Sequence, residues 1–93
     1  MSETPQEGLP YTPQQVFEVV QTERSYQELG KTAWNHQGYP SIEAELLLME
    51  EYLLRARTAW STSSDKNEVL DVLRKVVGVG FRCFENHGCP KRQ

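Results

Sequence analysis

The feature that most constrains the fold is the stretch from Glu68 to Gly88, EVLDVLRKVVGVGFRCFENHG. Asp65 and Glu68 stand three residues apart just before the apolar run, which predicts a capping box at a helix N-terminus. Gly88 is the residue type that most easily adopts the left-handed conformation just past a helix end. A helix over about 66–87 would be apolar around most of its girth and must be covered on more than one side. In a chain of 93 residues, we expect another copy of the chain to supply part of that cover.

Two earlier segments also carry helix signals. Thr12-Pro13-Gln14-Gln15 combines a cap, a first-turn proline and a capping-box glutamine, which predicts a helix over about 13–36 that bends or breaks near Gly30. Ser41 caps a further helix over about 41–60, which follows the stop signal of residues 38–40. Apolar residues along that helix alternate in steps of four and three, the pattern of a coiled-coil-like seam: Ile42, Leu46, Met49, Leu53, Ala56 and Trp60.

These signals predict an all-α, oligomeric chain of three helices. Residues 61–64 form a short polar loop, typical of a connection between antiparallel helices. We therefore expect an antiparallel helical hairpin of about 41–60 and 66–87, packed by the N-terminal helix. Residues 1–11 read as a flexible segment, and 12–93 as a single helical domain. Gly78 and Gly80 weaken the third helix, and Gly80 on its apolar side predicts the close approach of another helix.

Composition narrows the class of protein. The net charge is −3, which argues against a protein that coats nucleic acid. No apolar run approaches the ~18 residues that a membrane span needs, and the N-terminus lacks the pattern of a secretory signal. We expect a cytoplasmic protein without membrane partners, in which Cys83 and Cys89 stay reduced. The spacing of Cys83 and His87 could chelate zinc, but a core cysteine beside a surface histidine is the plainer interpretation.

Four carboxylates form the first candidate site. Glu50 and Glu51 lie on the second predicted helix, and Glu68 and Asp71 open the third. In an antiparallel hairpin the two pairs would converge, and oxygen ligands of this kind suit Mg²⁺ bridging to substrate phosphates. The alternative is that the carboxylates are solvated and that Glu68 caps its helix.

Residues 48–56 and 68–73 resemble the MazG-like all-α nucleoside triphosphate pyrophosphohydrolases. That family carries E-x-x-E on one helix and E-x-x-D on the next, and it hydrolyses nucleotides with Mg²⁺. Glu68 and Asp71 match the second motif, whereas Leu53 or Leu54 stands where the first motif has its second glutamate. The resemblance implies a pyrophosphohydrolase fold with an incomplete metal site.

Basic and aromatic residues form the second candidate site. Arginine and lysine pair with phosphate, and flat aromatic faces stack bases. The same cations near a helix C-terminus would also complement the helix dipole, and the aromatic residues could instead be core. The candidate ligand-binding residues are Trp34, Tyr52, Trp60, Arg74, Lys75, Arg82, His87, Lys91 and Arg92.

The C-terminal run of residues 73–92, LRKVVGVGFRCFENHGCPKR, resembles the ends of small accessory proteins of tailed phages. Phage proteins of this size include oligomeric sponges that bind host immune nucleotide signals without cleaving them. The resemblance implies a homo-oligomer that sequesters a nucleotide-like anion, such as a cyclic nucleotide signal, in the cytoplasm of an infected bacterium and without a cofactor. The alternatives are a MazG-like Mg²⁺-dependent enzyme and a helical inhibitor of a host protein.

Overall fold

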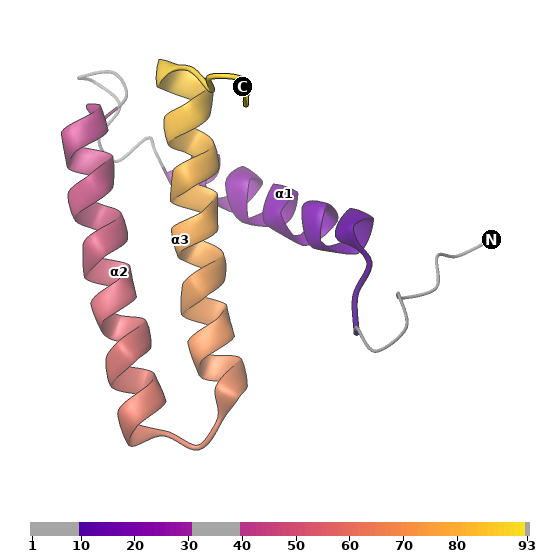
Figure 1. The fold of residues 1–93 in the computed structure, drawn as a ribbon, viewed down its shortest axis with the longest axis vertical. Helices are drawn as coiled ribbons and strands as arrows, with labels where there is room; N and C mark the ends of the chain where they lie inside the picture. The colour runs from indigo at the N-terminus through magenta and orange to yellow at the C-terminus, as the bar shows by residue number, and fades with distance from the viewer. Residues whose placement is uncertain (1–9, 31–39, 93) are drawn as a thin grey trace.

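The computed structural model describes residues 10–30 and 40–92, which form three α-helices and contain no strand. Helix α1 spans Pro13–Gly30, α2 spans Ile42–Thr62 and α3 spans Lys66–His87 (Figure 1). The prediction of an all-α chain with three helices is confirmed for these residues. The expected extension of the first helix to about His36 lies outside them, as does the predicted flexible segment apart from its last two residues.

The predicted caps account for where the helices begin and end. At α1, the Thr12 backbone N–H donates to Gln15 Oε1 at 2.7 Å, and the Gln15 N–H donates to Thr12 Oγ1 at 3.1 Å. This reciprocal pair is the capping box that the sequence predicts. Ser41 Oγ accepts from the Ala44 N–H at 3.1 Å at the start of α2. Gly88 ends α3 with φ 117°, in the region that favours glycine.

The cap of α3 differs in one contact from the predicted capping box. Asp65 Oδ1 accepts from the Asn67 N–H at 2.9 Å, so Asp65 is the N-cap as expected. The Asp65 backbone N–H, however, donates to Ser63 Oγ at 3.1 Å rather than to a glutamate three residues on. The serine-rich connection thus supplies the acceptor, because its hydroxyl lies only two residues away.

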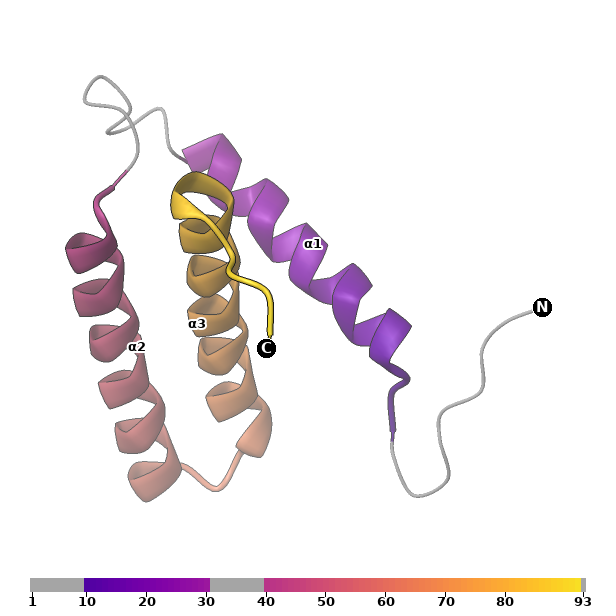
Figure 2. The same cartoon turned by 45° about the horizontal axis from the view of Figure 1, so that its top comes forward.

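Helix α3 is the element that both other helices contact. In Figures 1 and 2, α2 lies beside α3 and runs antiparallel to it, and α1 crosses α3 obliquely on another side. No helix in the described part of the chain combines the length and the apolar character that a membrane span needs.

Gly78, rather than Gly80, marks the closest approach of another helix. A Cβ added at Gly78 would lie 2.6 Å from Glu23 Cγ and 2.7 Å from Gln27 Nε2, both on α1. A Cβ at Gly80 would meet only the Met49 sulfur of α2, at an ordinary 3.8 Å. The prediction that Gly80 admits the neighbouring helix is therefore wrong. The helices cross at Gly78 because α1 packs against the polar side of α3. There the Glu23 and Gln27 side chains occupy the space that a side chain at position 78 would fill.

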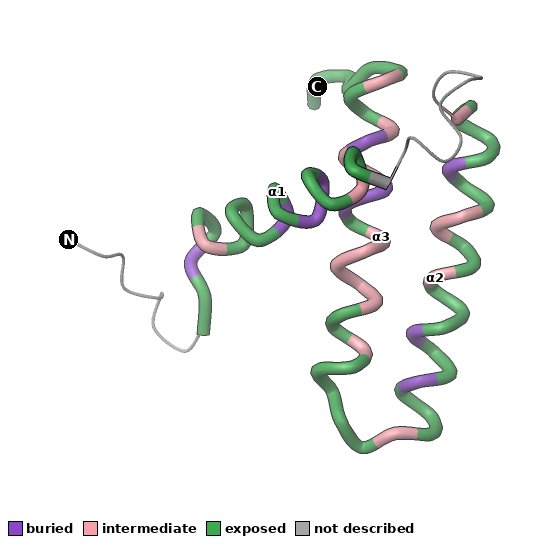
Figure 3. Tube along the Cα trace, turned by 180° about the vertical axis from the view of Figure 1, so that it is seen from behind, coloured by how far each residue is buried: buried purple, intermediate pink, exposed green. Residues whose placement is uncertain are grey.

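Few of the described residues are buried (Figure 3). Among the described residues the buried apolar side chains are Val20, Ala56, Ala59 and Val79. The predicted seam of α2 is mostly turned to solvent, with Leu46 57% and Leu53 45% exposed. Large apolar side chains are exposed at Tyr11, just before α1, and on all three helices: Val16, Phe17, Val19, Tyr26, Leu29, Ile42, Leu46, Leu47, Leu53, Leu54, Trp60, Leu70, Val77 and Phe84.

Candidate functional site

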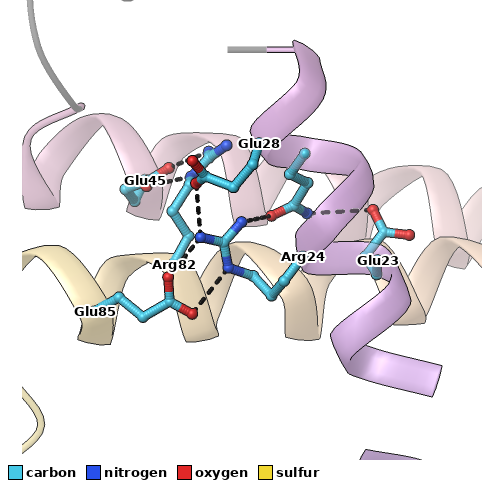
Figure 4. A network of polar contacts seen from close by, with 7 residues as sticks. Glu23, Arg24, Glu28, Glu45, Arg82 and Glu85 are labelled. Atoms are coloured by element: carbon cyan, nitrogen blue, oxygen red, sulfur yellow. Dashed lines mark hydrogen bonds and ion pairs between the residues drawn. The ribbon is translucent and has the colours of Figure 1, made fainter. Parts of the chain in front are cut away.

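A buried ion pair joins α2 to α3. Glu45, in the first turn of α2, is fully buried, and Arg82 of α3 is 6% exposed. The guanidinium binds both carboxylate oxygens, with Nε–Oε2 at 2.7 Å and Nη2–Oε1 at 2.6 Å (Figure 4). This bidentate geometry is the strongest form of the arginine–carboxylate contact. Arg82 was predicted as a phosphate ligand, and in the structure its fork is occupied by Glu45.

A second arginine joins α1 to α3. Arg24 of α1 is buried and donates through Nε to Glu85 Oε2 of α3 at 3.0 Å, and through Nη2 to Glu28 at 2.8 Å (Figure 4). The hydrogen bond from Arg24, with the Coulomb attraction beside it, lowers the pKa of the Glu85 carboxyl below its usual value. The bond to Glu85, with Glu28 behind it, raises the pKa of Arg24 in turn. Both groups are therefore charged at neutral pH.

Arg74 is also committed to carboxylates. Its Nε donates to the buried Glu23 of α1 at 2.9 Å, and its Nη2 pairs with Asp71 at 2.6 Å. The hydrogen bond to Glu23 is the main reason that the pKa of Arg74 is raised. Gln27 Nε2 donates to the second oxygen of Glu23 at 3.2 Å. Arg74 and Arg82 thus hold the three helices together, a role that the prediction of phosphate ligands missed.

Over these ion pairs lies a groove between α1 and α2, floored by α3, which we call the central groove. Its volume is about 450 Å³, and its lining residues are Glu23, Tyr26, Gln27, Leu29, Leu48, Tyr52, Lys75, Val79 and Arg82. A neighbouring hollow shares Glu23, Tyr26 and Lys75 with it and adds Arg74. Tyr26 and Lys75 therefore stand where the two hollows meet.

The central groove combines flat aromatic surface with one uncommitted cation. Tyr26 is 72% exposed, and Tyr52 is half-buried with the Arg55 guanidinium 5.2 Å from its ring centre. Lys75 is half-buried, and among the basic residues described in the groove it is the one without an ion pair. Leu29, Leu48 and Val79 add apolar wall. Such a surface can hold a planar ring and one anionic group.

Of the predicted ligand-binding residues, the structure brings Tyr52, Lys75 and Arg82 to the central groove, with Arg74 next to it. Trp60 is 70% exposed at the far end of α2, whereas the chain terminus that carries Lys91 and Arg92 lies near the opposite end of the α2–α3 pair (Figure 1). One copy therefore cannot place Trp60 and this basic tail on the same small ligand.

One further predicted residue stands apart from the groove. His87 Nε2 lies 2.8 Å from the Pro40 carbonyl oxygen, which places the imidazole between the end of α3 and the segment before α2. Trp34 lies outside the described residues. His87 is not among the residues that line the groove.

The four predicted metal-binding carboxylates do not form a metal site. Among the described residues, no group of three or more carboxylate, histidine or cysteine side chains could hold a metal ion. Asp71 is paired with Arg74, and Glu51 with Arg55 at 3.5 Å. Glu51 and Glu68 do line one open hollow at the α2–α3 connection, together with Arg55. The pair of Cys83 and His87 likewise gathers no further ligand in this part of the chain.

Sequence reasoning missed Glu45, Arg24, Glu23 and Tyr26. A signal for Glu45 was present, because it shares one helical stripe with Tyr52, Ala56 and Ala59, and small residues on a stripe favour close packing of a neighbouring helix. For Arg24 and Glu23 the sequence carries no comparable signal, since both lie in a polar stretch of α1.

Comparison of the sequence with protein-family models finds no match, and comparisons with curated proteins and with solved structures find none either.

Proposed function

We propose that the protein is a homo-oligomeric binding protein that captures a nucleotide-like anion in the central groove and does not cleave it. The α2–α3 hairpin is the framework of this proposal, with α1 as the second wall of the groove. The resemblance of the C-terminal run to phage accessory proteins makes host cyclic nucleotide signals the first ligands to test, and would place the protein in the cytoplasm of an infected bacterium.

The observation that carries the proposal is that Lys75 lines the same groove as Tyr26 and Tyr52. An aromatic face contributes about 1–3 kcal/mol when a base stacks on it, whichever base it is. The lysine ammonium supplies a point charge for phosphate. Arg82 lines the groove and Arg74 lines the neighbouring hollow, and carboxylates balance the charge of both. Lys75 therefore provides the positive charge that the groove offers to a ligand.

Capture is favoured over hydrolysis by the arrangement of the carboxylates. A Mg²⁺-dependent pyrophosphohydrolase needs oxygen ligands that converge on the metal and hold it against the phosphates. Asp71 instead neutralises Arg74, and the four predicted carboxylates are not part of any group of three or more side chains in the described residues that could hold a metal. The groove has the aromatic and cationic residues that binding needs. The described residues do not contain the metal centre that a MazG-like enzyme needs.

A second candidate function is inhibition of a host protein through an apolar surface. Its supporting observation is the exposed apolar stripe of α2, where Leu46, Leu53 and Trp60 are each 45–70% exposed. Exposed apolar surface of this extent marks an interaction site. This function would apply if the stripe stayed uncovered in the purified protein.

The test is incubation of the protein with Mg²⁺ and a mixed panel of nucleoside triphosphates and cyclic nucleotides, followed by chromatography before and after heat denaturation. We expect one panel member to leave solution and to return intact on heating. A panel that stays unchanged throughout would contradict capture, and conversion to a monophosphate and pyrophosphate would establish the enzyme instead.

Two lysine variants localise the effect. Lys75→Gln removes the proposed phosphate contact and should weaken capture at least about tenfold, the equivalent of one charge-assisted contact of about 1.4 kcal/mol. Lys66→Gln is the matched control, because Lys66 is an exposed residue in the first turn of the same helix and does not line the groove. Equal capture by the two variants would contradict the assignment of the site.

A further inference from the structure

One face of the α2–α3 pair carries apolar side chains that the described parts of the chain leave uncovered. We call it the hairpin face. It consists of two exposed stripes, one on each helix: Leu46, Leu53 and Trp60 on α2, and Leu70, Val77 and Phe84 on α3. We infer that a second copy of the chain covers this face, hairpin against hairpin, to give a four-helix bundle about a two-fold axis.

The spacing within each stripe is that of a helix-packing seam. Successive members are seven residues apart on both helices. A seven-residue apolar repeat keeps one face of a helix aligned with a neighbouring helix that runs along it. Within the chain, α2 instead meets α3 through another stripe, which includes the buried Ala56 and Ala59. Each helix therefore has a second seam that the described parts of the chain leave exposed, and on α3 two of its members, Leu70 and Val77, also line an open hollow beside α1.

A contact between the helices places the two seams on the same face. Met49 lies against Gly80, since a Cβ there would be 3.8 Å from the Met49 sulfur. Leu46 and Leu53 lie one turn to either side of Met49, and Val77 and Phe84 lie one turn to either side of Gly80. Residues three or four apart are neighbours on a helix surface, so both exposed stripes border this contact.

The two seams also share a common centre. Counting along antiparallel helices from the Met49–Gly80 contact places Leu53 level with Val76 and Val77. The same count places Leu46 level with Phe84, and Trp60 level with Leu70, to within a residue. The face thus has three levels: Leu46 with Phe84, Leu53 with Val77, and Trp60 with Leu70. A two-fold axis through the middle level would place the first level of one copy opposite the third level of the other. Such self-complementarity is the requirement of a two-fold interface.

Charge on the rim of the seam fits the same axis. Glu50 and Arg57 are exposed, and each lies between members of the α2 stripe. When α2 of one copy runs antiparallel to α2 of the other about Leu53, Glu50 of each copy faces Arg57 of its partner. A parallel arrangement would place like charges opposite each other, so the rim favours the antiparallel one.

The area of the face suits a stable dimer. The exposed fractions of its members run from 43% for Val77 to 70% for Trp60. Together with Ile42, these side chains present roughly 700 Å² per copy, close to the ~800 Å² that each partner buries in a standard interface. The central groove uses a different stripe of α3, that of Lys75, Val79 and Arg82, and stays open when the hairpin face is covered.

The inference deepens the oligomeric part of the proposed function and is tested without a ligand, by sedimentation equilibrium of the full chain over 1–100 µM. The wild type should have at least twice the chain mass of 10.7 kDa. Leu53→Glu should dissociate it, weakening association at least a hundredfold. Leu54→Glu is the matched control, because Leu54 is also an exposed leucine, 59% against 45% for Leu53, one position along and off the face. A monomeric wild type, or equal behaviour of the two variants, would overturn the inference.

A charge exchange tests the orientation. Glu50→Arg should weaken association several-fold by setting two arginines opposite each other at both symmetry-related positions, and adding Arg57→Glu should restore it. A double variant that associates no better than Glu50→Arg would overturn the antiparallel arrangement. Circular dichroism of each variant verifies folding. The nucleotide panel is measured separately, so loss of capture in a chain that still associates is a failure of the ligand assignment alone.

Discussion

At the scale of single residues, the Glu45–Arg82 pair is the contact on which the joining of α2 and α3 depends most. Two charges buried together have given up their hydration, and the pair compensates for this only while both partners are present. Removing one partner leaves a buried charge without a counter-ion. The pair therefore specifies how α2 sits on α3 more than it adds to the free energy of unfolding.

Arg82→Met should lower the free energy of unfolding by about 3–5 kcal/mol, because it strands the fully buried Glu45 carboxylate. The double variant Glu45→Leu with Arg82→Met should recover most of this loss. Urea denaturation followed by circular dichroism measures both, with Arg92→Met in the exposed C-terminal tail as control. A loss below about 0.5 kcal/mol in Arg82→Met, within the range of ordinary surface substitutions, would contradict the role given to the pair.

The Arg24–Glu85 contact should make stability depend on pH in the acid range. The pKa of Glu85 is lower in the folded state than its ordinary value near 4.5. Ionisation of Glu85 therefore stabilises the folded state at every pH above about 4.5. That contribution disappears as the pH falls through the lowered folded value. Glu85→Gln should thus be less stable than wild type at pH 7, and the gap should close toward pH 2 in urea titrations. A gap independent of pH would contradict the assigned cause.

The sequence predicted the residues that begin and end the helices better than those that join them. The capping residues contact neighbours a few positions away, so their roles can be predicted from local spacing. These residues are Thr12, Ser41, Asp65 and Gly88. The carboxylates that Arg74 and Arg82 reach on other helices lie 51 and 37 positions away. Nothing in local spacing indicates which carboxylate of another helix an arginine reaches, which is why both were assigned to a ligand.

At the scale of the helices, α2 shows why the type of an element was predictable and its packing face was not. Its apolar residues form adjoining stripes, and the cleanest heptad repeat suggested the inner face. In the structure the face of α2 that packs on α3 contains Glu45 and two alanines. Because Glu45 is charged, the sequence pattern does not mark this face as buried. Local pattern fixes the helix, but the choice between neighbouring stripes depends on a partner elsewhere in the chain.

Alanine at the two glycines of α3 should have opposite effects on stability. Gly80→Ala should raise the free energy of unfolding by up to about 1 kcal/mol, through helix propensity at a site with ordinary contact. Gly78→Ala should lower it by about 1–2 kcal/mol, since its Cβ would overlap Glu23 and Gln27 of α1. Thermal unfolding at one protein concentration gives both values. A stabilising Gly78→Ala would contradict the close packing of α1 on α3.

At the scale of the whole molecule, the described chain buries too little apolar surface to complete a core. Four apolar side chains are buried, and two of these are alanines. Charged residues are buried alongside them: Glu23, Arg24, Glu45 and Arg82. Burying a large apolar side chain contributes roughly 1.5–3 kcal/mol to the free energy of unfolding. The exposed leucines, valines and aromatic residues would therefore add most of the available hydrophobic stabilisation if they became buried. Association of several copies of the chain would bury these side chains.

The central claim is that folding is completed by association, and the dependence of stability on protein concentration tests it most directly. Any partner that binds the folded chain alone raises its apparent stability by mass action. We predict that the midpoint of urea unfolding rises steadily as the protein concentration is raised from 1 to 100 µM. A midpoint that is the same across this range would mean that one copy folds by itself, and would contradict the account.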